Sequence, residues 1–528
     1  MSSEVFSFIS FGGIGETGFN SYLFTVNGKK FLVDFGIAMP TPFMPSTSTI
    51  VPDVESMKEL FKNISGIIFT HGHEDHIGAY HYFKDFFKKV PVIASPLTLE
   101  LINIKLKESG KTQIKNYIPI EGVNTKISLN GLDFNFFKTK HSIPQSYGLY
   151  FKTPLGCIVF TSDFKEIYNL KKIPENPFIL FFDATNSEIK ENKEEAEVNK
   201  NIEKLFKETR GAIIVSTFST NLERISKIIK LSKKYNRKIF ISGKNLEKSI
   251  QIGKKLKIFD NFTAENFEKI NKYKREDVLI LTTGTQGERY SSLNFISMGN
   301  FKGFKIKEGD TVIISSSIIP RNEIYIYDMI NRLSEKGAMV YYAKTDDIHT
   351  SGHASLKELS KVLSYFNPKH IVPIHGEHRQ LSMARRFIHL KKDTGLSILK
   401  PNPGDEYIFN SKSDITIKKH TVKKLYVDED SNEFISLYVI KERKKLSEGG
   451  IILIEIGDEI TILSYGFLDN NSNFFDTLKD YVILKFKTYK SENLNKSYVK
   501  ESLEKDVKSF IKKRINKKPY VVINLMGD

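Results

Sequence analysis

A short stretch near position 70 concentrates the side chains that most often bind metal ions. In Thr70-His71-Gly72-His73-Glu74-Asp75-His76, three imidazoles and two carboxylates fall within six positions. His71 and His73 are two positions apart, so in an extended loop their rings project to the same side. Neutral imidazole nitrogens and carboxylate oxygens suit zinc, or manganese where oxygen predominates, without any thiolate. The spacing predicts a metal site, the alternative being a polar loop that is rich in histidine by chance.

Three more polar residues stand where a predicted strand ends, which is where α/β and sandwich folds open their sites. His141 follows the apolar run Phe134 to Phe137, Asp163 ends the run Ile158 to Ser162, and His375 follows Ile371 to Ile374. One such residue alone would more often be a helix cap or a surface group. Three of them after the histidine-rich loop indicate that they complete its metal site.

These side chains can be assembled around two metal ions. We expect His71, His73 and His141 on one ion, Asp75, His76 and His375 on the other, and Asp163 between them. Two ions about 3.5–4 Å apart can lower the pKa of a shared water and stabilise the oxygens of an in-line phosphoryl displacement. Asp34 and Glu377 are candidates for orienting the imidazoles, and a structural ion pair is an equal alternative for each.

A second polar cluster, His349-Thr350-Ser351-Gly352-His353-Ala354-Ser355, precedes the helical pattern Leu356 to Tyr365. Backbone N–H groups at such a position favour an anion, so the cluster predicts a phosphate site. The alternative is a serine N-cap beside histidines without a role. Thr283 to Glu288 is a weaker candidate for a phosphate or active-site loop. Phe218 could stack on a base, although burial is the commoner fate of an aromatic ring.

The first part of the chain must supply the strands that carry these residues. Short β-type runs alternate with turn glycines at Val5 to Ile9, Lys30 to Asp34, Val90 to Ala94 and Gly156 to Thr161, and a helix is expected at Thr98 to Ser109. Many short strands with few helices predict two stacked sheets covered by helices.

From about residue 199 the pattern changes. Amphipathic helical patterns at Ile202 to Thr209 and Leu222 to Tyr235 alternate with apolar runs at 212–215, 238–241 and 278–281. This rhythm predicts a parallel sheet with helices on both faces, extending to about residue 345. Histidine-bearing strand ends return afterwards, so the first domain is expected to be discontinuous, with an α/β domain inserted into it.

The C-terminal part differs again. The charged stretch Lys441 to Lys445 is typical of a linker. Strands at Gly450 to Glu455 and Glu459 to Leu463, with a helix at Val499 to Ile515, predict a small α+β domain.

Composition sets outer limits. A length of 528 residues predicts two or three domains. No apolar stretch reaches the roughly 18 residues of a membrane span, and no secretory signal is expected at the N-terminus. The one cysteine, Cys157, lies in an apolar run and is expected to be a buried strand residue, which fits a reducing cytoplasm.

The formal net charge of +17 indicates a polyanionic partner such as nucleic acid. An AT-rich genome is an alternative explanation, because it would enrich any protein in Lys, Asn, Ile and Phe and deplete Trp. The net charge is consistent with a nucleic-acid partner but does not by itself establish one.

Taken together, the motifs resemble those of the metallo-β-lactamase superfamily, within it the β-CASP nucleases, and most closely the ribonuclease J family. The likeness spans nearly the whole chain, from Gly12-Gly13-Ile14-Gly15-Glu16 to Lys517-Lys518-Pro519-Tyr520-Val521-Val522. Between these ends it includes the metal and phosphate motifs above, Thr161 to Lys165, Asp183-Ala184-Thr185-Asn186, Phe218 to Asn221, Thr283 to Glu288, and Pro320 to Glu323.

The resemblance implies an α/β protein: a metallo-β-lactamase αββα sandwich with an inserted β-CASP α/β domain and a small C-terminal α+β domain. The expected boundaries are 1–198 and 347–434 for the two parts of the sandwich, 199–346 for the insertion, 435–449 for the linker and 450–528 for the C-terminal domain.

The activity that the resemblance implies is a 5′→3′ exoribonuclease that prefers a 5′-monophosphate and also cuts internally. It implies two Zn²⁺ per subunit, with Mn²⁺ or Mg²⁺ supporting activity. Carried over residue by residue, the metal ligands are the seven residues assigned above, and His349, Thr350, Ser351, Gly352 and His353 would hold substrate phosphates. The catalytic residues would be Asp75, Asp163 and His353. Asp75 would assist the attacking hydroxide, Asp163 would bridge the metals, and His353 would stabilise the pentavalent phosphorus or protonate the leaving 3′-oxygen.

The resemblance also implies partners. The inserted domain would hold single-stranded RNA, including mRNA and rRNA precursors, over the metals. The C-terminal domain would support a homodimer or higher oligomer, which could include a paralogous subunit. A cytoplasmic location with no membrane association is expected.

Three residues depart from the family pattern. Gln145 replaces an acid, Ser162 a glycine before Asp163, and Arg321 the glycine of a Pro-Gly-Asn-Glu turn. None removes a metal ligand, so the departures bear on substrate preference more than on catalysis.

Two other functions remain open at this point. One is a mainly structural, RNA-binding subunit that stabilises an active paralogue. The other is a β-CASP enzyme that acts on DNA, or a small-ester hydrolase of the wider superfamily. An inserted domain and a phosphate cluster disfavour esters, whereas RNA over DNA rests on the family likeness alone.

Overall fold

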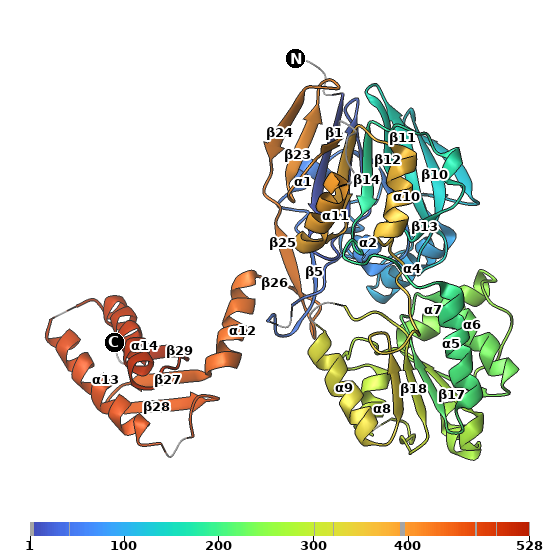
Figure 1. The fold of residues 1–528 in the computed structure, drawn as a ribbon. Helices are drawn as coiled ribbons and strands as arrows, with labels where there is room; N and C mark the ends of the chain where they lie inside the picture. Colours follow the sequence, from blue (N-terminus) through green and yellow to red (C-terminus); the bar gives the residue numbers. More distant parts are fainter. Residues whose placement is uncertain are drawn as a thin grey trace. The chain divides into compact units, whose positions relative to one another are not determined.

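The computed structural model describes residues 5–41, 43–299, 301–319, 322–390, 396–469, 472–492 and 494–526 (Figure 1). The chain divides into two compact units, one of Met1–Met39 with Val51–Lys424, the other of Pro40–Ile50 with Leu425–Asp528. Within the described residues, no helix combines the length and apolar character needed to cross a membrane.

Two sheets form the centre of the first unit. The first has the strand order β24-β23-β1-β3-β4-β6-β7-β8. Its strands are β1 (Phe6–Gly12), β3 (Ser21–Val26), β4 (Lys29–Val33), β6 (Ile64–Ile68), β7 (Val92–Ala94), β8 (Tyr117–Pro119), β23 (Asp405–Phe409) and β24 (Ile415–Lys419).

The second sheet has the order β13-β10-β11-β12-β14-β20-β22, with β9 paired to β10. Its strands are β9 (Asn124–Leu129), β10 (Leu132–Lys140), β11 (Ser146–Thr153), β12 (Gly156–Phe160), β13 (Glu166–Ile167), β14 (Ile179–Asp183), β20 (His370–Ile374) and β22 (Ser397–Ile398). A further short pair joins β2 (Ile14–Gly15) to β21 (Gly376–Glu377).

Phenylalanine rings fill the space between these sheets. Phe8 of β1 meets Phe181 of β14 edge-on with ring centroids 4.8 Å apart, and Phe24 of β3 meets the same ring at 5.3 Å. All three are fully buried. Each buried ring of this kind stabilises the fold by about 1.5–3 kcal/mol. Phenylalanine rings thus form much of this core, and the chain has no Trp.

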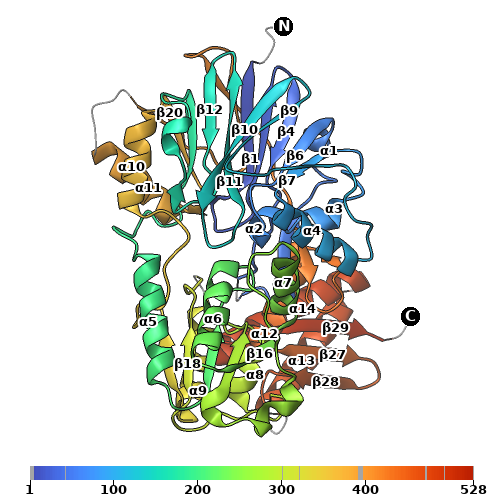
Figure 2. The same ribbon diagram turned by 90° about the vertical axis from the view of Figure 1, so that its right-hand side faces the viewer.

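Helices cover the outer faces of the two sheets. Figure 2 shows α10 and α11 on the side of β20 and α1 to α4 on the side of β6 and β7. These helices are α1 (Lys58–Phe61), α2 (Glu74–Ile77), α3 (Tyr80–Phe83), α4 (Pro96–Glu108), α10 (Leu356–Phe366) and α11 (His378–Leu390). The four layers form the αββα sandwich that was expected.

The direction of the strands brings the polar residues to one edge. β12, β14 and β20 run parallel to one another, so their carboxyl ends lie side by side. Asp163, Asp183 and His375 follow or end these strands. β4 and β6 are likewise parallel, which places Asp34 beside the loop that begins at Thr70.

The inserted region is a five-stranded parallel sheet in the order β16-β17-β15-β18-β19. Its strands are β15 (Ile213–Ser216), β16 (Lys238–Ser242), β17 (Val278–Thr282), β18 (Thr311–Ile314) and β19 (Met339–Tyr342), and its helices are α5 (Glu195–Glu208), α6 (Leu222–Lys234), α7 (Lys244–Lys255), α8 (Ser292–Met298) and α9 (Glu323–Glu335). The central strands are buried on both faces, which explains their unbroken apolar sequence. Leu97 and Ile143 of the sandwich belong to the same hydrophobic core as α6 and β15.

The second unit contains the sheet β28-β27-β29, with β27 (Ile451–Ile456), β28 (Ile460–Tyr465) and β29 (Tyr520–Leu525). Helices α13 (Phe474–Ser491) and α14 (Lys496–Ile515) pack on it through residues such as Leu478, Val482, Leu503 and Val507. Helix α12 (Leu437–Gly449) occupies most of the range expected to be a linker. A small sheet, β26-β25-β5, is made of β5 (Thr47–Pro52), β25 (Lys424–Asp428) and β26 (Phe434–Ile435).

Candidate metal centre

Backbone hydrogen bonds fix the histidine-rich loop against two neighbouring segments. Phe35 N donates to His76 O at 2.7 Å, and Asn20 N donates to Asp75 O at 2.9 Å. Gly36 packs so closely that a Cβ added there would lie 1.6 Å from Asp75 O. The turn of helix α2 that carries Asp75 and His76 is therefore held in one position.

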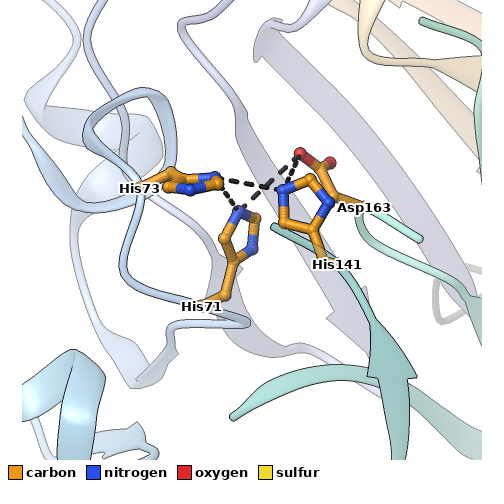
Figure 3. Close-up of side chains that lie close together, drawn as sticks. All are labelled: His71, His73, His141 and Asp163. Atoms are coloured by element: carbon orange, nitrogen blue, oxygen red, sulfur yellow. Dashed lines mark hydrogen bonds and ion pairs between the residues drawn. The ribbon is translucent and has the colours of Figure 1, made fainter. Parts of the chain in front are cut away.

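His71, His73, His141 and Asp163 form the first cluster (Figure 3). His73 Nδ1 lies 3.1 Å from His71 Nε2 and 3.1 Å from His141 Nε2. Asp163 Oδ2 lies 3.7 Å from His71 Nε2 and 3.6 Å from His141 Nε2. Three ring nitrogens and one carboxylate oxygen thus point toward the same small volume.

Asp75, His76 and His375 form the second cluster. Asp75 Oδ2 lies 3.0 Å from His375 Nε2 and 3.7 Å from His76 Nε2. Asp163 Oδ2 lies 3.3 Å from His76 Nε2 and 3.6 Å from His375 Nε2. The same carboxylate oxygen therefore faces both clusters, as a bridging ligand must.

These spacings fit a divalent metal. Zinc–nitrogen distances of about 2.0–2.1 Å in a tetrahedron put ligand atoms roughly 3.3 Å apart, which is the range seen here. His71 Nε2, His73 Nδ1 and His141 Nε2 would otherwise crowd their lone pairs together, because imidazole nitrogens that lack protons cannot bond to one another. The donor set is that of zinc, or of a similar ion that accepts nitrogen and oxygen.

The pKa shifts differ between the first cluster and the second. Burial lowers the pKa of His73 to about 3 and of His141 to about 4, and lowers that of His71 well below 6.5. Burial opposes protonation of His375 too, but the nearby Asp163 and Asp75 carboxylates outweigh it and raise the pKa to about 9. Burial raises the pKa of Asp163, yet His375 and His76 hold it well below 3.8. The imidazoles of the first cluster and the Asp163 carboxylate are thus in the forms that coordinate metals. Burial opposes protonation of His76 as well, but nearby carboxylates raise its pKa well above 6.5, so His76 and His375 would each release a proton when an ion binds.

Buried partners orient the rings. Asp34 Oδ2 lies 2.8 Å from His76 Nδ1, and Gly352 O lies 2.8 Å from His141 Nδ1. Thr185 Oγ1 contacts His375 Nδ1 and donates to His375 O at 2.7 Å. Of the two orienting candidates named above, Asp34 contacts a ring, whereas Glu377 Oε2 pairs with Arg379 Nε at 3.1 Å.

The predicted phosphate stretch reaches the clusters at its C-terminal end. His353 Nδ1 lies 2.7 Å from Asp183 Oδ2 and 3.9 Å from Asp163 Oδ2. Burial alone would lower the pKa of His353, but the Asp183 and Asp163 carboxylates raise it above 6.5. His353, Asp183, Asp163 and His375 form a third group that could hold a metal. His353 therefore lies at the metal centre.

The other end of the stretch lies apart from the clusters. Lys165 Nζ donates to Thr350 Oγ1 at 2.9 Å, and His353 N donates to Ser351 Oγ at 3.2 Å. Burial lowers the pKa of His349 to about 3, with Arg224 and Lys165 adding to the effect. His349 belongs to none of the metal-binding groups found in the described part of the chain.

Sequence reasoning assigned no role to Asp183, Thr70 or Thr185. Asp183 ends β14 in the run Asp183 to Asn186, a polar strand end like Asp163, and that signal was available. No comparable sequence signal pointed to Thr70 or Thr185, because a hydroxyl residue after a strand is common.

The weaker loop candidate, Thr283 to Glu288, makes hydrogen bonds within the inserted region. Gln286 Nε2 donates to Ser317 O at 2.9 Å, and Ile319 N donates to Gln286 Oε1 at 2.8 Å, so Thr283 to Glu288 supports a neighbouring loop of the inserted region. Phe218 is half-buried.

Two of the three departures have structural explanations. Gln145 Oε1 accepts from Leu97 N at 2.9 Å and so caps the start of helix α4. Ser162 Oγ donates to Thr70 Oγ1 at 2.7 Å. Arg321, in the segment Pro320 to Glu323, lies outside the described residues.

The sandwich, the inserted parallel sheet and the His/Asp clusters define a metal-dependent hydrolase of the metallo-β-lactamase superfamily with a β-CASP insertion. Comparison with known families agrees. Residues 14–181 match "Metallo-beta-lactamase superfamily", 210–333 match "Ribonuclease J, beta-CASP domain", 340–401 match "Zn-dependent metallo-hydrolase RNA specificity domain", and 438–527 match "Ribonuclease J C-terminal domain".

Similarity to individual proteins shows which family within this superfamily the chain belongs to. The chain is 30% identical to Ribonuclease J of Helicobacter pylori (strain B128), over 96% of this chain and 77% of that protein. It is 29% identical to Ribonuclease J of Thermus thermophilus, over 97% and 94% respectively. A crystal structure of a protein of unknown function from Enterococcus faecalis V583 shares the fold, with a TM-score of 0.53, 15% identity, and coverage of 76% of this chain and all of that one.

The chain belongs to the ribonuclease J family, and it is a metal-dependent ribonuclease. The expectations of fold class, family and ribonuclease activity are confirmed, and divalent metal binding and RNA binding follow from the matched families.

Proposed function

We propose that this ribonuclease degrades RNA from a 5′-monophosphorylated end in the 5′→3′ direction and also cuts internally, in RNA maturation and decay. The observation that carries the proposal is the sharing of Asp163 Oδ2 between two ligand clusters beside His353. That arrangement suits in-line phosphoryl displacement. The 5′-end preference rests on the family and on the phosphate stretch that leads into the same centre.

The proposed metal is zinc, two ions per subunit, with Mn²⁺ or Mg²⁺ supporting turnover. The proposed ligands are His71, His73 and His141 for one ion, Asp75, His76 and His375 for the other, and Asp163 for both. Ions bound there supply Lewis acidity and lower the pKa of water toward neutrality. The chain's own part is to fix these seven side chains before substrate arrives.

Asp75 and His353 have proposed roles on opposite sides of the phosphate. Asp75 would accept a hydrogen bond from the attacking water. His353 donates Nδ1–H to Asp183 Oδ2, so its Nε2 side is available to the scissile phosphate or the leaving 3′-oxygen. Asp183 then acts as His353's positioning residue.

The 5′ phosphate is assigned to the stretch His349 to His353. The Lys165 ammonium, held 2.9 Å from Thr350 Oγ1, adds positive charge beside this stretch. Charge-assisted contacts of this kind favour a terminal phosphate group, and the preference for a monophosphate over a triphosphate rests on the family. Single-stranded mRNA and rRNA precursors are the proposed substrates. A cytoplasmic location and a homodimer or higher oligomer, with or without a paralogous subunit, remain predictions, as do the domain boundaries.

The test is a time course on uniformly labelled RNA with a 5′-monophosphate or a 5′-triphosphate, in zinc plus manganese and then in EDTA. We expect chelator-sensitive release of mononucleotides that is faster from the monophosphate. Internal cuts regardless of the 5′ group would make endonuclease activity dominant. Absence of any cleavage by zinc-loaded protein would refute the proposal and favour the structural subunit.

A variant pair tests the role of His353. His353→Gln should keep zinc content while the single-turnover cleavage rate falls by roughly 10²–10⁴-fold, the usual contribution of a general acid. The control is His389→Gln, near the end of α11 and outside all three metal-binding groups. Loss of zinc in His353→Gln would instead make His353 a metal ligand.

A further inference from the structure

Ser162 occupies an unusual position directly before the bridging Asp163. Its φ is +53°, in the left-handed region that residues with a Cβ enter only at a cost in free energy. It is 2% exposed, so its hydroxyl cannot be satisfied by bulk water. That hydroxyl donates to Thr70 Oγ1 at 2.7 Å. A strained, buried polar residue beside a catalytic centre calls for a functional explanation.

Thr70 connects this bond to a proposed metal ligand. Thr70 Oγ1 donates to Asp34 Oδ2 at 2.9 Å and lies 3.1 Å from His71 Nδ1. A hydroxyl has one proton and two lone pairs. Since the Asp34 carboxylate takes the proton, the lone pairs must accept from Ser162 and from His71 Nδ1–H. Every hydrogen-bonding capacity of Thr70 is then used.

These hydrogen-bond assignments at Thr70 Oγ1 determine which nitrogen of His71 carries the proton. With the proton on Nδ1, the lone pair of Nε2 faces His73 and Asp163, where the first metal ion is proposed. The opposite tautomer would place a proton at Nε2 and exclude the ion. The Ser162 hydroxyl polarises Thr70 and strengthens its bond to Asp34, because hydrogen bonds in a buried chain reinforce one another. Thr70 is thereby kept from turning its proton toward His71.

We propose that Ser162 is a positioning residue for metal binding, acting through Thr70 to hold His71 in its ligating tautomer. The inference rests on the proposed metal site. Removing the hydroxyl should weaken zinc binding by about 10–100-fold, the range typical of groups that orient metal-bound histidines. The fold should not suffer, since the backbone strain at residue 162 is relieved by glycine.

The experiment compares wild type with Ser162→Gly and Ser162→Ala. Glycine removes both hydroxyl and strain, whereas alanine removes the hydroxyl and keeps the strain. The control is Lys257→Gly, which relieves a similar φ of +54° at an exposed site in the inserted region. Three quantities are measured: the zinc dissociation constant by chelator competition, the visible spectrum of the cobalt-substituted protein, and the melting temperature of the metal-free protein.

We expect both Ser162 variants to bind zinc more weakly, with an altered cobalt spectrum, while metal-free Ser162→Gly melts no lower than wild type. Equal zinc affinity in wild type and both variants would overturn the inference and leave the metal site standing. Weakening by alanine alone would also overturn it, because backbone strain would then be the cause. A wild-type protein that binds no zinc or cobalt would refute the metal site itself.

Discussion

Gly36 gives the sharpest test of how the metal centre is built. Any side chain there meets the backbone of the histidine-rich loop, since an added Cβ would lie 1.6 Å from Asp75 O. Real Cβ atoms stay at least 3.0 Å from such a neighbour, so the carbonyl must retreat by about 1.4 Å. Asp75 and His76, which belong to the proposed second metal site, would move with it. A misplacement of about 1 Å can cost roughly 10²-fold in rate.

We therefore expect Gly36→Ala to reduce RNA cleavage by at least about 100-fold and to lower zinc content. Cleavage of labelled RNA and metal analysis of the purified protein measure the two effects. The matched control is Gly457→Ala in the second unit. A Cβ added there would lie 3.5 Å from its nearest neighbour, Met526 Cβ, which is an ordinary van der Waals contact. Gly36→Ala protein with zinc content and cleavage within about twofold of wild type would refute the reasoning.

Three further predictions concern other sites. His76→Ala should abolish turnover while RNA binding, measured by filter retention, stays within a few-fold, and loss of binding with retained turnover would contradict the proposed role. Cys157 lies in β12 as expected but is half-buried rather than buried. Burial still raises the pKa of its thiol to about 12, so this thiol should react with a disulfide reagent more slowly in native than in denatured protein, and equal rates would be the contrary result. Burial and nearby Lys105 lower the pKa of His81 to about 3 in the folded protein. As pH falls below 6.5, the unfolded chain therefore binds a proton at His81 that the folded protein does not bind, and the folded state loses stability. At pH 5.5 the free energy of unfolding should have fallen by about 1 kcal/mol for this reason. Urea unfolding of His81→Gln should lack this part of the pH dependence. An unchanged slope of the free energy of unfolding against pH would contradict the prediction.

The sequence was most predictive where chemistry and strand ends coincide. His141, Asp163 and His375 were predicted to lie together because each follows an apolar run. Parallel pairing of β12, β14 and β20 aligns the ends that carry Asp163 and His375. Strand β10, which ends before His141, runs in the same direction as β12 because both are antiparallel to β11. The helix expected at Thr98 to Ser109 is α4, which begins at Pro96 because Ser95 accepts from Thr98 N and caps it.

Other features could not be obtained from the sequence. Thr70 and Ser162 act through contacts between residues far apart in the chain, and such pairing has no local signal. The helical structure of α12, within the range 435–449 expected to be a linker, was not predicted because its many charges leave only a weak apolar face, of which Ile440 is the buried member. The role of Gln145 likewise depends on a contact distant in sequence, because its side-chain oxygen accepts from Leu97 N at the start of α4.

The discontinuity of the sandwich has a consequence for the order of events during synthesis. Asp163 emerges from the ribosome roughly 200 residues before His375, which is about 10–40 s at usual elongation rates. Until β20 pairs with β14, the centre lacks His353 and His375, and Asp163 lacks two of its neighbours. A nascent chain thus contains His71, His73 and His141 early, but all residues of the proposed metal centre are present only after the whole inserted domain has been made. A chain that stalls within the insertion therefore lacks His353 and His375, and with them part of the proposed metal centre.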